Sequence, residues 1–181
     1  MDRNIGRLLF GQEHKDAEYW MKEAVNEAKK YSTCLRRKCG AVVVMHLTGK
    51  INHIMGRGAN SPPGDLESQR RCNADKRELH EKVTDPTCCI HAEDRAVRDA
   101  LARNGPFKGL AEIRKFFRGS RIYYMGLNPS DNKIIYAGDP YCTGCSKLVL
   151  DAGISEFALW HEEGIRVYQT EDYNRLSFEF K

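Results

Sequence analysis

Four residues in two short motifs could together hold a metal ion and move a proton. His91 and Glu93 stand two residues apart in the motif His-Ala-Glu, and Cys142 and Cys145 form the motif Cys-Thr-Gly-Cys. Zinc accepts sulfur and nitrogen ligands, and a catalytic zinc site uses three protein ligands and leaves the fourth position to water. The residue types and their spacing therefore predict a zinc site made by His91, Cys142 and Cys145.

Glu93 would carry out the proton transfer at this site. At the start of a helix, the two-residue spacing lets the histidine reach the metal while the carboxylate reaches an adjacent pocket. Zinc lowers the pKa of its bound water from about 15.7 towards 7, and a neighbouring carboxylate can take that proton and pass it on. We therefore expect Glu93 to act as general base and general acid.

Less specific interpretations of the same motifs remain open. The two cysteines of the second motif could be buried thiols, and the histidine could be an ordinary helix cap. The three ligands could also form a purely structural zinc site together with Cys88 or Cys89. A structural site would have no use for Glu93, and we therefore prefer the catalytic interpretation.

The length and composition are those of a single globular domain. The chain has 181 residues, of which 41% are hydrophobic and 30% charged, and the mean hydropathy is −0.61. The net charge of +4 suits a phosphorylated small substrate but is weaker than the basic balance expected of a nucleic-acid-binding protein. We predict one domain over residues 1–181, with a core at about 15–160 and a C-terminal extension at 161–181.

The apolar segments and the cysteines indicate the cellular compartment. No run of about 18 apolar residues occurs, which argues against a transmembrane helix. Residues 1–14 show no signal-peptide pattern, so we expect a cytoplasmic protein. In a reducing compartment, the seven cysteines are better explained as metal ligands or buried thiols than as disulfides.

The hydrophobic pattern predicts helices that alternate with strands. Helices are expected in three segments: residues 14–31, 91–103 and 142–152. A shorter helix is expected within a basic insert at residues 106–119. Strands are expected at 40–45, 51–59, 120–127 and 154–160, with a turn at 46–50. Because helices join the later strands, those strands should run parallel, whereas the first two could form an antiparallel hairpin. The fold class is therefore α/β with a mixed sheet.

Two segments are harder to assign. Residues 60–90 lack clear periodicity, although residues 66–83 could form a polar helix. A long irregular segment in a small domain is commonly functional. Residues 161–181 show no pattern that favours one structure.

The two motifs and three further segments resemble the cytidine/deoxycytidylate deaminase superfamily, and most closely its dCMP deaminase branch. H-x-E followed by P-C-x-x-C is the signature of zinc nucleobase deaminases. Residues 32–42 are similar to the run S-x-C-x-R-x-x-V-G-A-V of that branch, residues 58–63 to its loop G-x-N-G-x-P, and residues 142–154 to its C-x-x-C helix. The resemblance covers about residues 15–160 and implies a three-layer α/β/α fold around a central mixed sheet.

The resemblance also implies a role for each residue of the site. Hydroxide would attack C4 of the pyrimidine, and Glu93 would protonate N3 and then the leaving amine. Three residues would contact the substrate: Asn60, Ala92 and Tyr141. Three basic residues of the segment 32–42 lie near the loop that could meet a 5′-phosphate, although each could also be a surface charge: Arg36, Arg37 and Lys38.

Three positions depart from the family pattern. Tyr141 stands directly before the first cysteine of the motif, where the family usually has proline, and the proline is displaced to Pro140. Cys39 replaces a usual valine, and Ser61 replaces the second glycine of the loop that contains Asn60. These departures concern the substrate more than the metal, because Tyr141 could change how the substrate is held.

The resemblance raises three further expectations. Some dCMP deaminases hold a second, structural zinc in the segment before the histidine motif. The candidate ligands in that region are Cys72, His80, Cys88 and Cys89. Their spacing matches no standard zinc site, and they could equally be free thiols and a surface histidine. The family also shows homo-oligomers and nucleotide effectors, and we expect both here.

Several functional hypotheses follow. The preferred one is zinc-dependent hydrolysis of a free cytosine nucleotide, dCMP to dUMP and ammonia. The second is deamination of bases within nucleic acid, in which the insert 106–119 and aromatic residues such as Phe116, Phe117 and Tyr141 would contact the strand. The others are deamination of another free base, nucleoside, purine or pterin, and a non-catalytic zinc protein.

Overall fold

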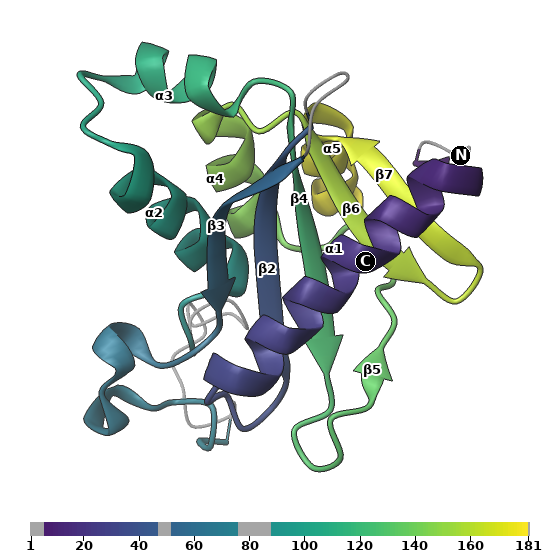
Figure 1. Cartoon of the computed structure of the whole chain (residues 1–181). Coiled ribbons are helices and arrows are strands. Elements are labelled where there is room, and N and C mark those ends of the chain that lie inside the picture. Colours follow the sequence, from purple (N-terminus) through teal and green to yellow (C-terminus); the bar gives the residue numbers. More distant parts are fainter. Residues whose placement is uncertain (1–5, 47–51, 76–87, 181) are drawn as a thin grey trace.

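Five α-helices cover the two faces of one mixed β-sheet in the computed structural model (Figure 1), which describes residues 6–46, 52–75 and 88–180. The helices are α1 (Gly11–Tyr31), α2 (Ala92–Asn104), α3 (Leu110–Phe117), α4 (Thr143–Ala152) and α5 (Thr170–Glu179). The strands are β1 (Arg7–Leu8), β2 (Lys38–Met45), β3 (His53–Ala59), β4 (Ser120–Leu127), β5 (Ile134–Ile135), β6 (Glu156–His161) and β7 (Gly164–Gln169). Within the described residues the seven strands follow the order β1-β7-β6-β4-β2-β3, and β5 pairs with β4.

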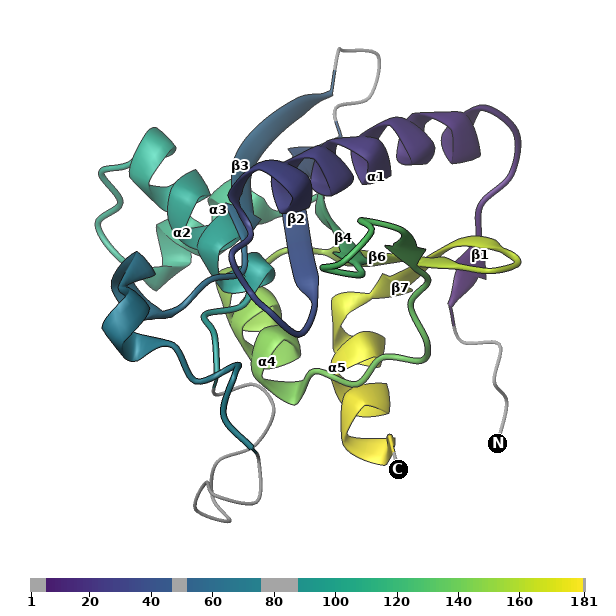
Figure 2. The ribbon, with the colours of Figure 1, turned by 90° about the horizontal axis from the view of Figure 1, so that it is seen from below.

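The layers are those of the expected α/β/α fold. Figure 2 shows α1 on one side of the sheet and α2, α4 and α5 on the other. Two groups of buried side chains correspond to these faces, one packed on α1 and the other on the remaining helices. The prediction of a three-layer α/β/α fold with a central mixed sheet is therefore confirmed.

The strand directions bring the ends of two strands to the same edge of the sheet. β2 is antiparallel to both β3 and β4, so β3 and β4 point the same way, and β6 is parallel to β4. The predicted hairpin and the predicted parallel pair are both confirmed. Helices α2 and α4 begin near the carboxyl ends of β3 and β4, the edge at which open α/β sheets bind ligands.

Helix α2 packs directly on β3 because two glycines face it. A side chain at Gly56 would overlap the carbonyl oxygen of Ala96, and one at Gly58 would overlap that of Ala92. A β-carbon at either position would force the helix away from the strand. The start of α2 is thereby held close to the end of β3.

The end of the chain belongs to the sheet. β7 pairs antiparallel with β6, β1 pairs with β7, and α5 follows directly. Sequence patterns predicted no definite structure for residues 161–181, and one of the two partners of β7, strand β1, comes from a distant part of the chain. In α5 the buried stripe is limited to Thr170, Tyr173 and Ser177.

Other expectations differ from the structure in detail. Helix α1 begins at Gly11 rather than at residue 14. No polar helix occupies the described part of residues 66–83, where a 3-10 turn at Glu67–Gln69 is found. Residues 76–87 and all but the first residue of the turn expected at 46–50 lie outside the described residues. None of the described helices combines the length and the apolar character needed to cross a membrane.

Candidate metal centre

The structure brings together the three residues expected to bind zinc. The Nδ1 atom of His91 lies 3.0 Å from Cys145 Sγ and 3.4 Å from Cys142 Sγ. The three donor atoms all lie within 4.8 Å of one another. Both cysteines are buried, and His91 is half-buried.

Two helix starts position these ligands. His91 is the N-cap residue of α2, and Cys142 is the N-cap residue of α4, where its sulfur accepts a hydrogen bond from the backbone N–H of Cys145 at 3.2 Å. An isolated β-bridge between Ser61 and Ile90 ties the residue before His91 to the loop after β3. The ligands therefore come from segments about fifty residues apart that meet at one edge of the sheet.

The donor set fits a zinc ion. Tetrahedral zinc with Zn–S of about 2.3 Å and Zn–N of about 2.0 Å places sulfur and nitrogen about 3.5 Å apart. The observed distances of 3.0 and 3.4 Å need only a small expansion. A hydrogen bond from Cys145, together with the contact to His91, lowers the pKa of Cys142 to about 5, and the thiolate is the form that binds a metal.

Glu93 lies beside the metal ligands, in the first turn of α2. Only 4% of the residue is exposed. Burial raises the pKa of its carboxyl group to about 7, although the positive charge of His91 opposes that shift. A group of this kind can both accept and release a proton near neutral pH, as the expected general acid and base must.

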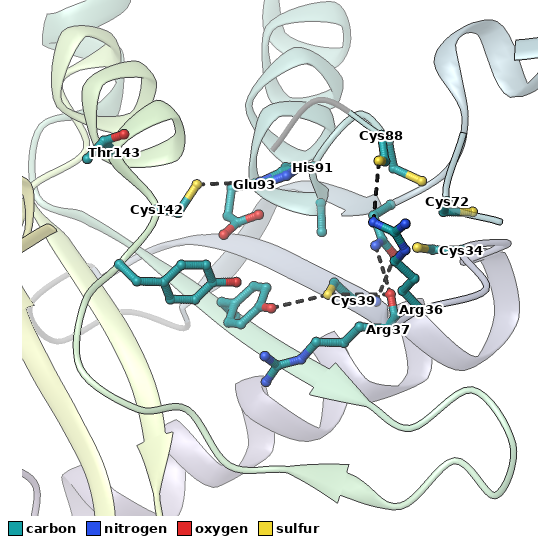
Figure 3. A pocket seen from close by; sticks show the side chains of 15 residues that line it. Cys34, Arg36, Arg37, Cys39, Cys72, Cys88, His91, Glu93, Cys142 and Thr143 are labelled. Atoms are coloured by element: carbon teal, nitrogen blue, oxygen red, sulfur yellow. Dashed lines mark hydrogen bonds between the residues drawn. The ribbon is translucent and has the colours of Figure 1, made fainter. Parts of the chain in front are cut away.

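A cavity of about 580 Å³ opens over these residues. This volume falls in the range of small-molecule sites. Figure 3 shows His91, Glu93 and Cys142 on one side of the cavity and Cys34, Cys72 and Cys88 on the other. The substrate-contact candidates Asn60, Ala92 and Tyr141 also line it.

Asn60 is held rigidly in the wall of the cavity. Its Oδ1 atom accepts hydrogen bonds from Ser32 Oγ at 2.6 Å and from the backbone N–H of Cys39 at 2.7 Å. Its Nδ2 atom donates to the carbonyl oxygen of Arg37 at 2.9 Å. An asparagine amide can make four hydrogen bonds, so one N–H of Asn60 has no partner within the described part of the chain and can serve a ligand.

The tyrosines of the cavity wall include one that sequence reasoning missed. Tyr141 is 43% exposed, and its ring contacts Phe180 at a centroid distance of 5.9 Å. Tyr124 also lines the cavity, and its hydroxyl lies 3.1 Å from Cys39 Sγ. Its neighbour Tyr123 faces α1 instead, and strand alternation alone could not tell which of the two would face the site because β4 is buried on both sides.

The three basic residues proposed for a phosphate lie in different places. Lys38 does not line the cavity, and its amino group donates to Asn132 at 3.1 Å. Arg36 lines the cavity but donates to the carbonyl oxygen of Ala74 at 2.6 Å and contacts Cys88 Sγ at 3.6 Å. Arg37 also lines the cavity, and Figure 3 shows its guanidinium group pointing away from Cys88.

A second group of thiols lies at the opposite side of the cavity. The sulfur atoms of Cys34, Cys72 and Cys89 lie within 4.8 Å of one another, and Cys88 belongs to the same buried cluster. Cys34 was not among the expected ligands, because it lies about forty residues before the others in sequence. His80 is outside the described residues.

The comparison with known families agrees with this geometry. A family model described as the cytidine and deoxycytidylate deaminase zinc-binding region matches residues 14–160. The chain belongs to this family. A search of curated proteins gives no match. The protein is therefore a zinc-dependent deaminase, a hydrolase whose His/Cys/Cys group fits the expected zinc.

We expect the substitution Cys145→Ser to remove the ion from this centre. A serine hydroxyl keeps its proton near neutral pH and is a poor zinc ligand, so two ligands would remain. The measurement is zinc per chain in freshly purified protein. Cys39→Ser is the matched control, because Cys39 is a buried thiol that belongs to neither group of metal donors. Equal zinc content in Cys145→Ser and Cys39→Ser would contradict the ligand assignment.

Proposed function

We propose that this deaminase acts on a free cytosine nucleotide, with dCMP as substrate and dUMP and ammonia as products. The observation that carries the proposal is the lining of one cavity: His91 and Cys142 of the metal-binding group, the buried Glu93, and Arg37, which has no anionic partner among the described residues. The metal-binding group and Glu93 provide for hydrolytic deamination. The arginine favours a substrate that carries a phosphate.

The residues of the cavity suit this reaction. When bound by His91, Cys142 and Cys145, zinc lowers the pKa of a water molecule and supplies the nucleophile at neutral pH. Glu93 would take one proton from that water and deliver it to N3 of the cytosine while the water oxygen bonds to C4. It would then take the second proton from that oxygen and give it to the amine, so that the C4–N bond breaks and C4 keeps the oxygen as a carbonyl. Water and the cytosine ring thereby give uracil and ammonia.

The cavity wall would orient the ring and the sugar. The remaining N–H of Asn60 is a donor for the base or the sugar, and its three hydrogen bonds to the protein keep it in place. Ala92 is fully buried at the start of α2 and leaves space beside Glu93. The half-exposed ring of Tyr141 offers an apolar surface to the base.

Arg37 is the residue that would bind the phosphate. Its Nη2 atom has one long hydrogen bond, to the carbonyl oxygen of Ile135 at 3.4 Å, and its Nε atom is buried without a partner. No carboxylate among the described residues forms an ion pair with it. Gly126 leaves room for this guanidinium, since a β-carbon there would overlap it. A planar guanidinium matches two phosphate oxygens.

The structure offers less support for a substrate within nucleic acid. Phe117 is fully buried, and the ring of Phe116 packs against it at a centroid distance of 4.9 Å. Neither residue lines the cavity. The aromatic residues of the basic insert therefore serve the core, which favours the free nucleotide.

We expect Glu93→Gln to lower kcat by at least about 10²-fold while zinc content stays unchanged, because glutamine cannot move a proton. The measurement is ammonia release from cytosine, cytidine, deoxycytidine, CMP, dCMP, dAMP and a cytosine-containing oligonucleotide. Glu162→Gln, in the exposed β6–β7 turn, is the control and should keep wild-type activity. Equal turnover by Glu93→Gln and wild type would remove Glu93 from the mechanism. Inactivity of the wild type on every cytosine compound would refute the proposed substrate class.

We expect Arg37→Met to reduce kcat/KM for dCMP by about 10- to 100-fold, the value of a lost charged hydrogen bond. The same variant should leave kcat/KM for deoxycytidine unchanged, because the nucleoside has no phosphate. Lys133→Gln is the control, since it removes one positive charge from a side chain that is 83% exposed and lies beside β5. A parallel loss on dCMP and deoxycytidine would show that Arg37 does not bind the phosphate.

We also propose that Cys34, Cys72 and Cys89 hold a second, structural zinc. Three buried sulfurs in one group are typical zinc donors, and Cys88 could supply a fourth. Two donors approach one of these sulfurs, since Arg70 Nη1 lies 3.4 Å and the backbone nitrogen of Leu35 lies 3.5 Å from Cys72 Sγ. Such donors stabilise thiolates in metal sites.

This second site predicts the total zinc content. Wild-type protein should contain two zinc ions per chain, Cys72→Ser one, and Cys39→Ser two. The ion that remains in Cys72→Ser should be the one bound by His91, Cys142 and Cys145, which is the ion that Cys145→Ser loses. Identical zinc content in wild type and Cys72→Ser would contradict the second site without affecting the first.

Further properties are proposed on the family resemblance. We propose that residues 1–181 act as one deaminase domain, that the protein is cytoplasmic, and that it forms a homo-oligomer regulated by a nucleotide effector. The contribution of β1 and β7 to a single sheet supports the first of these.

A further inference from the structure

Helix α5 borders the turn that carries both cysteine ligands. The helix spans Thr170–Glu179 and lies beyond the residues 14–160 matched by the family. It packs beside α4 on the same face of the sheet (Figure 2). Because Cys142 and Cys145 stand at the start of α4, contacts from α5 can act on the metal centre.

The first contact comes directly after Cys145. Ser146 is fully buried, and its hydroxyl lies 2.9 Å from Asn174 Oδ1 and 3.2 Å from Ser177 Oγ, both in α5. The same hydroxyl also lies 3.0 Å from the carbonyl oxygen of Thr143 in its own helix. The contacts with Asn174 and Ser177 both join the metal-binding turn to α5, and the one with the Asn174 amide is the shorter.

The second contact comes directly before Cys142. The ring of Phe180, the C-cap residue of α5, lies 5.9 Å from the ring of Tyr141 at an angle of 50°. The turn 142–145 is therefore held between two contacts with one helix, one before its first cysteine and one after its second. Two such contacts restrict how far the two sulfurs can move relative to His91.

Helix α5 is itself anchored in the core. Tyr173 is 2% exposed, and its ring stacks on Phe157 of β6 at 4.0 Å and meets Tyr168 of β7 edge-on at 6.1 Å. Thr170 Oγ1 donates to the carbonyl oxygen of Ile154 at 2.7 Å. These contacts fix the rotation of the helix about its axis, and Asn174 is thereby directed towards α4.

We infer that Asn174 and Phe180 are positioning residues of the metal centre. Neither belongs to the metal donors or lines the cavity. Residues behind metal ligands set the orientation of those ligands, and their loss weakens metal binding even when every ligand is present. The segment after the family match therefore contributes to metal affinity as well as to the fold.

The test compares zinc affinity and the visible spectrum of the cobalt(II)-loaded full-length protein. Asn174→Leu removes the acceptor of Ser146, and Phe180→Ala removes the ring against Tyr141. Each should weaken zinc binding by about 10-fold and shift the cobalt bands of this centre. The Cys145→Ser variant lacks this centre, so its cobalt(II) spectrum reports any metal bound elsewhere. That spectrum is subtracted from the spectra of the other proteins. Phe180 is 53% exposed, so its variant should fold even if Asn174→Leu does not.

Two controls separate positioning from general support of the fold. Asn174→Asp keeps an acceptor oxygen and should retain wild-type affinity and spectrum. Arg175→Gln removes exposed ion pairs to Asp172 and Glu179 within the same helix and should also leave both unchanged. The inference is overturned if Asn174→Leu and Phe180→Ala bind zinc as tightly as Arg175→Gln, even when their melting temperatures fall. It is also overturned if Asn174→Asp is as weak as Asn174→Leu.

Discussion

The metal centre depends on two helices that start at the same edge of the sheet. β2 is antiparallel to both of its neighbours, so β3 and β4 end at the same edge of the sheet, on either side of β2, and α2 and α4 begin there. Helix starts carry partial positive charge, which favours the thiolate form of a cysteine placed there. Cys142 stands at such a start and its sulfur accepts the backbone N–H of Cys145. The strand directions thus bring together two helix starts, one of which favours the form of its cysteine that binds a metal.

The packing of α2 against β3 and of α5 against α4 sets the distance between the metal ligands. Gly56 and Gly58 let the backbone of α2 rest on β3, which sets where His91 and Glu93 stand. Helix α5 sets the position of the start of α4, and so of Cys142 and Cys145, through the bond between Asn174 and Ser146. The two halves of the donor set are thus supported from distant parts of the chain, one by the β2–β3 hairpin and the other by helix α5.

One buried hydrogen-bond network connects the cavity wall to the second group of thiols. The amide of Asn60 joins the segment before β2 to the loop after β3, by bonds to Ser32, Cys39 and the Arg37 carbonyl. Cys34 lies within that segment, and Arg36 contacts Cys88. A metal ion on the thiols would therefore stabilise the same segment that places Arg37 in the cavity. The structural and the substrate-binding sides of the cavity share one length of chain.

The sequence by itself determined the donor types, the helices that begin at His91 and Cys142, the hairpin and the parallel strand pair, because each follows from local spacing or hydrophobic period. The tertiary structure alone decided which side chains meet. Tyr124 and Arg37 rather than Tyr123 and Lys38 face the cavity, Cys34 joins thiols far along the chain, and α5 reaches the metal-binding turn. Strands buried on both faces and contacts between distant segments leave no periodic pattern, and so sequence could not assign these positions.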